Sequence, residues 1–162
     1  MATLKPSILV PYDATELSIK ALDKAVEIAT NMDYTILLLY IIDDASFCPS
    51  KMEKFISNQK DFEKAKKYFV NSIREGADKH LIQLVNKIKE KNKTKEKESF
   101  VRYIIRVGHP ADEILSVSKD PNIHLIVMGS SGSLKKRHNR KGVGSISRWI
   151  SEVASCPVVL MR

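Results

Sequence analysis

Cysteine is nearly absent from this chain, which holds only Cys48 and Cys156 among its 162 residues. Two cysteines do not make the disulfide framework of a small secreted protein, so we expect both to be reduced thiols. Cys156 and Arg162 satisfy the C-x5-R spacing of cysteine phosphatases. That chemistry needs a loop whose backbone N–H groups curl around a phosphate, whereas the intervening PVVLM predicts a buried strand.

Long apolar runs are also missing. The longest, residues 36–42, has about the length of one strand and is far too short to span a bilayer. The N-terminal MATLKPSILVPYD has neither the uninterrupted apolar stretch nor the small-residue cleavage site of a secretory signal. We therefore expect a cytoplasmic protein that is not attached to a membrane.

Acidic residues are fewer than basic ones, and the excess gives a net charge of +8 and a pI of about 9.5. Such a charge favours anionic partners. Residues 86–98 alternate lysine with glutamate and predict a solvated helix end and loop, but residues 135–141 carry five cations and no acid. Aromatic residues make up only 7% of the chain, and no stacking motif accompanies the basic segment, which argues against nucleic acid as the partner.

Apolar residues follow strand and helix periods in alternation along the chain. Pro11 ends the first predicted strand, and either Asp13 or Thr15 can cap the helix that follows. The predicted strands are 7–11, 35–42, 99–108, 123–129 and 157–161, and the predicted helices are 15–30, about thirty residues from Phe62, 110–119 and 144–155.

This βαβαβαβαβ order predicts right-handed crossovers and the α/β class. A length of 162 residues is typical of one domain, and neither a repeat nor a linker divides the chain. We expect residues 1–162 to form a single domain, an open five-stranded parallel sheet with helices on both faces.

Ligands of open parallel sheets bind beyond the carboxyl ends of the strands, where the strand order reverses. Two predicted turns lie at such ends: residues 11–14 after the first strand, here named the first-strand turn, and residues 129–133 after the fourth, the glycine–serine turn. If these two strands are neighbours, both turns flank one crevice.

The glycine–serine turn has the composition of a phosphate site. Gly129 and Gly132 can adopt positive φ, and successive N–H groups in such a turn form an anion-binding concavity. Ser130, Ser131 and Ser133 add hydroxyl donors. The start of the last predicted helix, at Gly144 and Ser145, offers a second anion site through its free N–H groups and helix dipole. Taken singly, each of these residues could also be explained as part of a simple turn, a helix cap or a solvated basic loop.

Five segments in the right order resemble the universal stress protein family, and together they cover nearly the whole chain. They are ILVPYDATELSIKALDKAVEIA, ILLLYIID, RVGHPADEIL, HLIVMGSSG and SISRWISEVASCPVVLM. The resemblance implies a Rossmann-like fold of the adenine-nucleotide alpha-hydrolase type.

The ATP-binding branch of that family carries G-x2-G-x9-G-[ST]. Gly129 and Gly132 match its first half, but the glycine nine residues further on, Gly142, precedes valine. Gly144, followed by Ser145, fits the pattern with a two-residue insertion in the loop. We prefer this register because it also suits the helix that follows.

The resemblance implies a role for each matching residue. Pro11, Tyr12 and Asp13 would lie beside the adenine and ribose, and Ile41 would close over the base. Helix capping by Asp13 and core packing by Ile41 are the alternatives. The remaining predicted contacts hold ribose and phosphates: Gly129, Ser130, Ser131, Gly132, Ser133, Leu134, Lys135, Gly144, Ser145, Ile146 and Ser147. The implied ligand is ATP, with ADP or AMP as alternatives and Mg²⁺ or Mn²⁺ on the phosphates.

Members of the family commonly pair their last strands as homodimers, and PVVLM is an apolar edge of that kind. The implied function is a stress or signalling protein whose bound nucleotide sets its conformation or its choice of an unknown protein partner. Slow ATP hydrolysis near Asp13 and polyanion binding by residues 135–141 are the alternatives. No residues have catalytic spacing, and no cluster has metal-ligand spacing.

Overall fold

The computed structural model describes residues 5–43, 58–92, 100–131 and 142–162 of the chain. Strands and helices alternate through them as the sequence predicts, with ends that differ by at most three residues. The elements are β1 Ser7–Pro11, α1 Glu16–Met32, β2 Thr35–Ile42, α3 Gln59–Lys91, β3 Val101–Val107, α4 Pro110–Ser118, β4 Ile123–Gly129, α5 Ser145–Val153 and β5 Val158–Met161.

The sheet has the strand order β3-β2-β1-β4-β5, and each neighbouring pair is parallel. From β1 the chain builds outward through β2 to β3, then crosses to the other side of β1 for β4 and β5. The order therefore reverses between β1 and β4, and these two strands are neighbours, which is the condition stated above for a single crevice.

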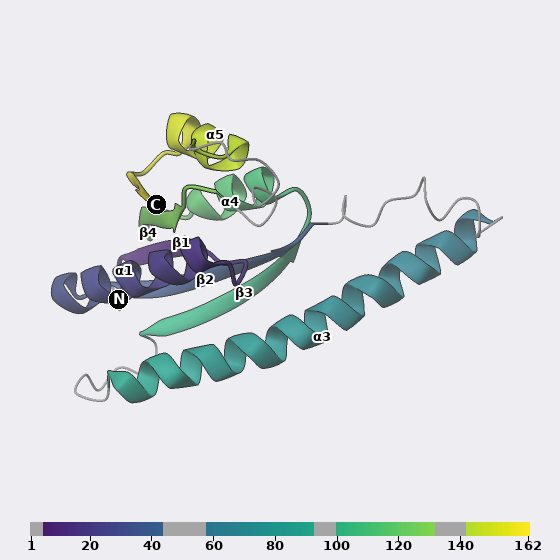
Figure 1. Cartoon of the computed structure of the whole chain (residues 1–162), viewed down its shortest axis with the longest axis horizontal. Coiled ribbons are helices and arrows are strands. Elements are labelled where there is room, and N and C mark those ends of the chain that lie inside the picture. Colours follow the sequence, from purple (N-terminus) through teal and green to yellow (C-terminus); the bar gives the residue numbers. More distant parts are fainter. Residues whose placement is uncertain (1–4, 44–57, 93–99, 132–141) are drawn as a thin grey trace.

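Helices cover both faces of the sheet, α1 and α3 on one and α4 and α5 on the other (Figure 1). Successive side chains of a strand point to opposite faces. Ile8 and Val10 of β1 accordingly pack toward α1 and α3, whereas Leu9 between them packs toward α4 and α5. Burial on both faces explains why the central strands read as continuous apolar runs.

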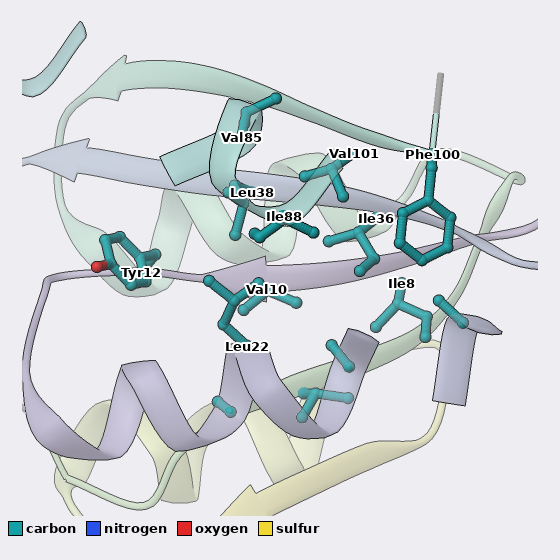
Figure 2. Packing of buried hydrophobic residues seen from close by; sticks show 14 of the residues in the cluster. Ile8, Val10, Tyr12, Leu22, Ile36, Leu38, Val85, Ile88, Phe100 and Val101 are labelled. Carbon is teal, nitrogen blue, oxygen red and sulfur yellow. The ribbon is translucent and has the colours of Figure 1, made fainter. Parts of the chain in front are cut away.

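The core on the α1 and α3 side joins residues from distant parts of the chain. Figure 2 shows Val10 of β1 and Leu38 of β2 beside Leu22 of α1 and Val85 of α3. Burying each such side chain contributes roughly 1.5–3 kcal/mol relative to its exposure. This packing fixes the ends of β1 and β2, where the predicted site begins.

The long helix α3 packs on the sheet through only part of its length. Its buried residues are Ala77, Leu81, Val85 and Ile88, three or four positions apart in its C-terminal half. The first turns of α3 extend past the sheet (Figure 1), and Tyr68 there is 80% exposed. Within the residues described, no helix is both long enough and apolar enough to cross a membrane.

Candidate functional site

The pairing between the neighbouring strands β1 and β4 stops before either strand ends. The β1–β4 ladder runs from Ser7 opposite Ile123 to Leu9 opposite Ile126, although both strands continue beyond this last pair. At their ends Pro11 pairs with β2 and Gly129 pairs with β5 instead. This separation lies where the strand order reverses, the position at which open α/β sheets bind ligands.

The first-strand turn follows β1, on one side of this separation, here called the split between β1 and β4. Asp13 Oδ1 accepts hydrogen bonds from both the backbone N–H and the hydroxyl of Thr15. Thr15, not Asp13, is the N-cap of α1, and its hydroxyl accepts from Ser18 N at 3.4 Å. Ala14 has a φ of 60°, a left-handed conformation that costs a residue with a Cβ roughly 1–2 kcal/mol. Asp13 is exposed and supports the cap indirectly.

Tyr12 belongs to the core more than to the turn. It is only 5% exposed, and Figure 2 shows its ring at the end of β1 with Val10 and Leu38. Burial, with a smaller contribution from the charge of Asp13, raises the pKa of Tyr12 above its ordinary value. Its side chain therefore packs on the α3 side of the sheet, and only its backbone contributes to the first-strand turn.

The described part of the glycine–serine turn is held from two sides. Ser130 N donates to Met161 O of β5 at 2.8 Å, and Ser130 O accepts from Gly144 N at 2.7 Å. Ser147 Oγ donates to Gly129 O at 2.9 Å. These bonds fix the N terminus of α5 against the end of β4. The predicted site residues Gly132, Ser133, Leu134 and Lys135 lie outside the described residues, as does the basic segment 135–141.

The helix α5 begins at Ser145, with Gly144 as its N-cap. Among the residues described, no side chain caps this N terminus, and its first turn holds no acid. Its free N–H groups and dipole favour an anion. A Cβ at Gly144 would lie 3.3 Å from Ser130 O, so glycine lets the two turns approach closely.

Gly129 lets the end of β4 pack closely on the first turn of α1. A Cβ at this position would lie 2.9 Å from Leu17 Cβ, in the first turn of α1. Real Cβ atoms do not approach so closely, so the backbone of α1 or β4 would have to shift. The end of β4 and the start of α1 are thus packed directly on each other.

We expect Gly129→Ala to lower the free energy of unfolding by about 1–3 kcal/mol, the usual cost of overpacking. Gly76→Ala is the matched control, because nothing lies within 4 Å of a Cβ at that site in α3. There the same substitution should stabilise by about 0.5–1 kcal/mol, since alanine is the better helix former. Urea denaturation measures both, and equal effects of the two changes would refute the close packing.

Ile41 lies near the end of β2 on the α4 and α5 side of the sheet, opposite Arg106 of β3. Its side chain is half-buried and packs with the core on that side. Core packing is therefore part of its role, and its exposed part remains beside the strand ends.

The described residues also bear on two other kinds of chemistry, metal binding and catalysis by a cysteine nucleophile. No group of three or more His, Cys, Asp or Glu side chains there gathers closely enough to hold a metal ion. Burial raises the pKa of the Cys156 thiol, the opposite of what a phosphatase nucleophile needs. Most of the residues between Cys156 and Arg162 belong to the strand Val158–Met161, as the sequence predicts.

Three contacts beside the first-strand turn and the end of β4 were not predicted from the sequence. Leu17 packs against Gly129, Ser18 Oγ binds Thr15 O at 2.9 Å, and His80 contacts Tyr12. Ser18 keeps the helical spacing of buried positions, which is a weak signal. The other two contacts join residues far apart in the chain, and nothing in the sequence pattern pairs them.

Comparison with known proteins identifies the same family that the five sequence segments resemble. The profile of the universal stress protein family matches residues 6–162. The chain belongs to this family. It is similar to universal stress protein YxiE of Bacillus subtilis, at 30% identity over 96% of this chain and 97% of that protein. A universal stress protein of Methanocaldococcus jannaschii is 26% identical over 100% and 98% of the two chains.

Solved structures of universal stress proteins share the fold. UspA from Lactobacillus plantarum superposes with a TM-score of 0.76 at 23% identity, covering 97% of both chains. Two further universal stress protein structures, each at a TM-score of 0.56, are complexes with adenine nucleotides. One is with cAMP, at 16% identity over 97% of both chains. The other, from Archaeoglobus fulgidus, is with dAMP, at 17% identity over 98% of both chains.

Proposed function

We propose that this protein binds an adenine nucleotide in the split between β1 and β4, and that the nucleotide sets its conformation or its partners in stress response or signalling. The end of the β1–β4 ladder at the reversal point supports the proposal, because the first-strand turn and the start of the glycine–serine turn follow these two neighbouring strands. ATP is the proposed ligand, with ADP and AMP as alternatives.

The phosphates would face the side of the split formed by β4 and α5. Ser130 and Ser131 would offer hydroxyl donors there, although the Ser130 N–H is already bonded to Met161 O. The first turn of α5, from Ser145 to Ser147, would offer backbone N–H groups, because no side chain among the described residues caps it. The predicted residues 132–135 would complete this side. Since the described residues form no metal cluster, Mg²⁺ or Mn²⁺ would arrive on the phosphates themselves.

The base and ribose would lie toward β1 and β2. Pro11 and Asp13 border the split from the first-strand turn, and half-buried Ile41 offers an apolar surface on the neighbouring strand. Tyr12 would contribute through its backbone, because its ring is packed in the core. The cAMP and dAMP complexes of related universal stress proteins support an adenine nucleotide as the class of ligand.

Titration calorimetry of the purified protein with ATP, ADP and AMP tests the proposal, with GTP as the control for base recognition. Each titration is run with and without Mg²⁺ or Mn²⁺. We expect a dissociation constant in the micromolar range or tighter for at least one adenine nucleotide. The proposal fails if none of the three binds under either condition.

We also propose that two copies pair along β5. This strand is at the end of the sheet order and bonds to β4 on one side only, which leaves an edge for a second chain. Sedimentation equilibrium should then give about twice the 18.3 kDa of one chain. A mass of one chain at micromolar concentration would contradict it.

A further inference from the structure

A contact between α3 and the end of β1 is not used by the proposed site. The Tyr12 hydroxyl and His80 Nε2 share a hydrogen bond of 3.2 Å, although the residues are 68 positions apart. Their rings stack with centroids 6.0 Å apart and an angle of 15° between planes. His80 is exposed and lies next to Leu81, one of the residues that bury α3 on the sheet.

Tyr12 is held at three points. Its backbone N–H donates to Leu39 O of β2 at 2.9 Å, its ring packs in the core on the α1 and α3 side, and its hydroxyl binds His80. The next residue, Asp13, starts the exposed part of the first-strand turn. Any rotation or shift of Tyr12 is therefore passed directly to Asp13.

The first-strand turn needs such support. Ala14 holds a left-handed φ of 60°, which alanine does not favour by itself, so the surrounding contacts must maintain the turn. On one side Asp13 Oδ1 accepts a hydrogen bond from Thr15 N. On the other side Tyr12 anchors the turn to the sheet and to α3.

We propose that His80 is a positioning residue for the first-strand turn. Through the hydroxyl and ring of Tyr12 it fixes the angle at which Asp13 faces the split between β1 and β4. Its effect on nucleotide affinity rests on the proposed function, but its effect on the turn does not. The alternative is that His80 merely satisfies a tyrosine hydroxyl and stabilises the whole fold.

Amide hydrogen exchange of the protein without nucleotide separates these roles. His80→Leu removes the hydrogen bond, His80→Gln keeps a side-chain amide there, and Gln83→Leu is a control at an exposed position of the same helix. We expect the Thr15 amide, which donates to Asp13, to exchange about 3- to 10-fold faster in the leucine variant of His80. It should change less than about twofold in the other two variants.

The Ser130 amide, bonded to Met161 O on the other side of the split, is the internal reference. A positioning role leaves its exchange unchanged. Equal acceleration of Ser130 and Thr15 would mean general destabilisation and would overturn the proposal, as would an unchanged Thr15. In a Tyr12→Phe background, His80→Leu should have no further effect on Thr15, because the hydrogen bond is already lost.

ATP titration of the same variants then tests the connection to the ligand. His80→Leu should weaken the affinity by a factor similar to its effect on Thr15 exchange, and His80→Gln should restore it. If the turn loosens but the affinity stays the same, His80 does not position the site and the proposal falls. If the wild-type protein binds no nucleotide, the proposed function falls instead, and the exchange experiment alone decides the role of His80.

Discussion

ATP at a thousand times its dissociation constant is expected to raise the melting temperature of this protein by about 8–16 °C. Binding to the folded state alone adds about 4 kcal/mol at that ratio. For a chain of 162 residues, each kcal/mol shifts the melting temperature by roughly 2–4 °C. Differential scanning calorimetry with and without ATP measures the shift, and GTP at the same concentration controls for nonspecific phosphate effects.

Ser131→Asp should remove most of this shift. A carboxylate in the glycine–serine turn would face the phosphates, and juxtaposed like charges cost several kcal/mol, so we expect affinity to fall roughly 100-fold. At unchanged ATP concentration the ligand then stabilises the protein by only about 1.4 kcal/mol, and the shift drops to roughly 3–6 °C.

Ser131→Asn is the matched control, because asparagine has the size of aspartate without its charge. It should keep the affinity within about fivefold, the range of one neutral hydrogen bond. If both variants bind ATP equally well, Ser131 does not face the phosphates and the glycine–serine turn is not the phosphate side of the site. A shift that is absent in the wild-type protein would reject nucleotide binding itself.

The sequence was sufficient for the elements and their order because local signals determine both. Pro11 ends β1, glycine precedes α5, and apolar runs of strand length are separated by helical periods. The rule that parallel strands need right-handed crossovers leaves few topologies for such an order. The adjacency of β1 and β4, stated from the sequence only as a condition for the predicted crevice, is found in the structure.

The sequence was not sufficient where a contact joins distant residues. Either Asp13 or Thr15 could cap α1 by composition, and the left-handed turn at Ala14 decides for Thr15 by bringing Asp13 back onto it. Tyr12 reads as a residue of the turn, yet the position of α3 places its ring in the core beside His80. Such choices depend on the packing of helices on the sheet, which periodicity does not specify.

The packing of α3 itself gives the last prediction. Leu81 is 0% exposed and lies in the core on the α1 and α3 side, whereas its neighbour Ile82 is 43% exposed. We expect Leu81→Ala to lower the free energy of unfolding by about 2–5 kcal/mol, because it removes buried methyl groups and leaves a cavity. Ile82→Ala should cost less than about 1 kcal/mol, since little buried surface is lost.

Urea denaturation of both variants measures the difference, and it bears on the site as well. Because Leu81 holds the turn of α3 that carries His80, the alanine variant should also loosen Tyr12 and speed exchange at Thr15. If Ile82→Ala destabilises as much as Leu81→Ala, α3 packs through another face, and the His80 contact would not form. If Leu81→Ala destabilises the protein without changing exchange at Thr15, the hydrogen bond between Tyr12 and His80 is sufficient to hold the first-strand turn even when α3 packs less tightly on the sheet.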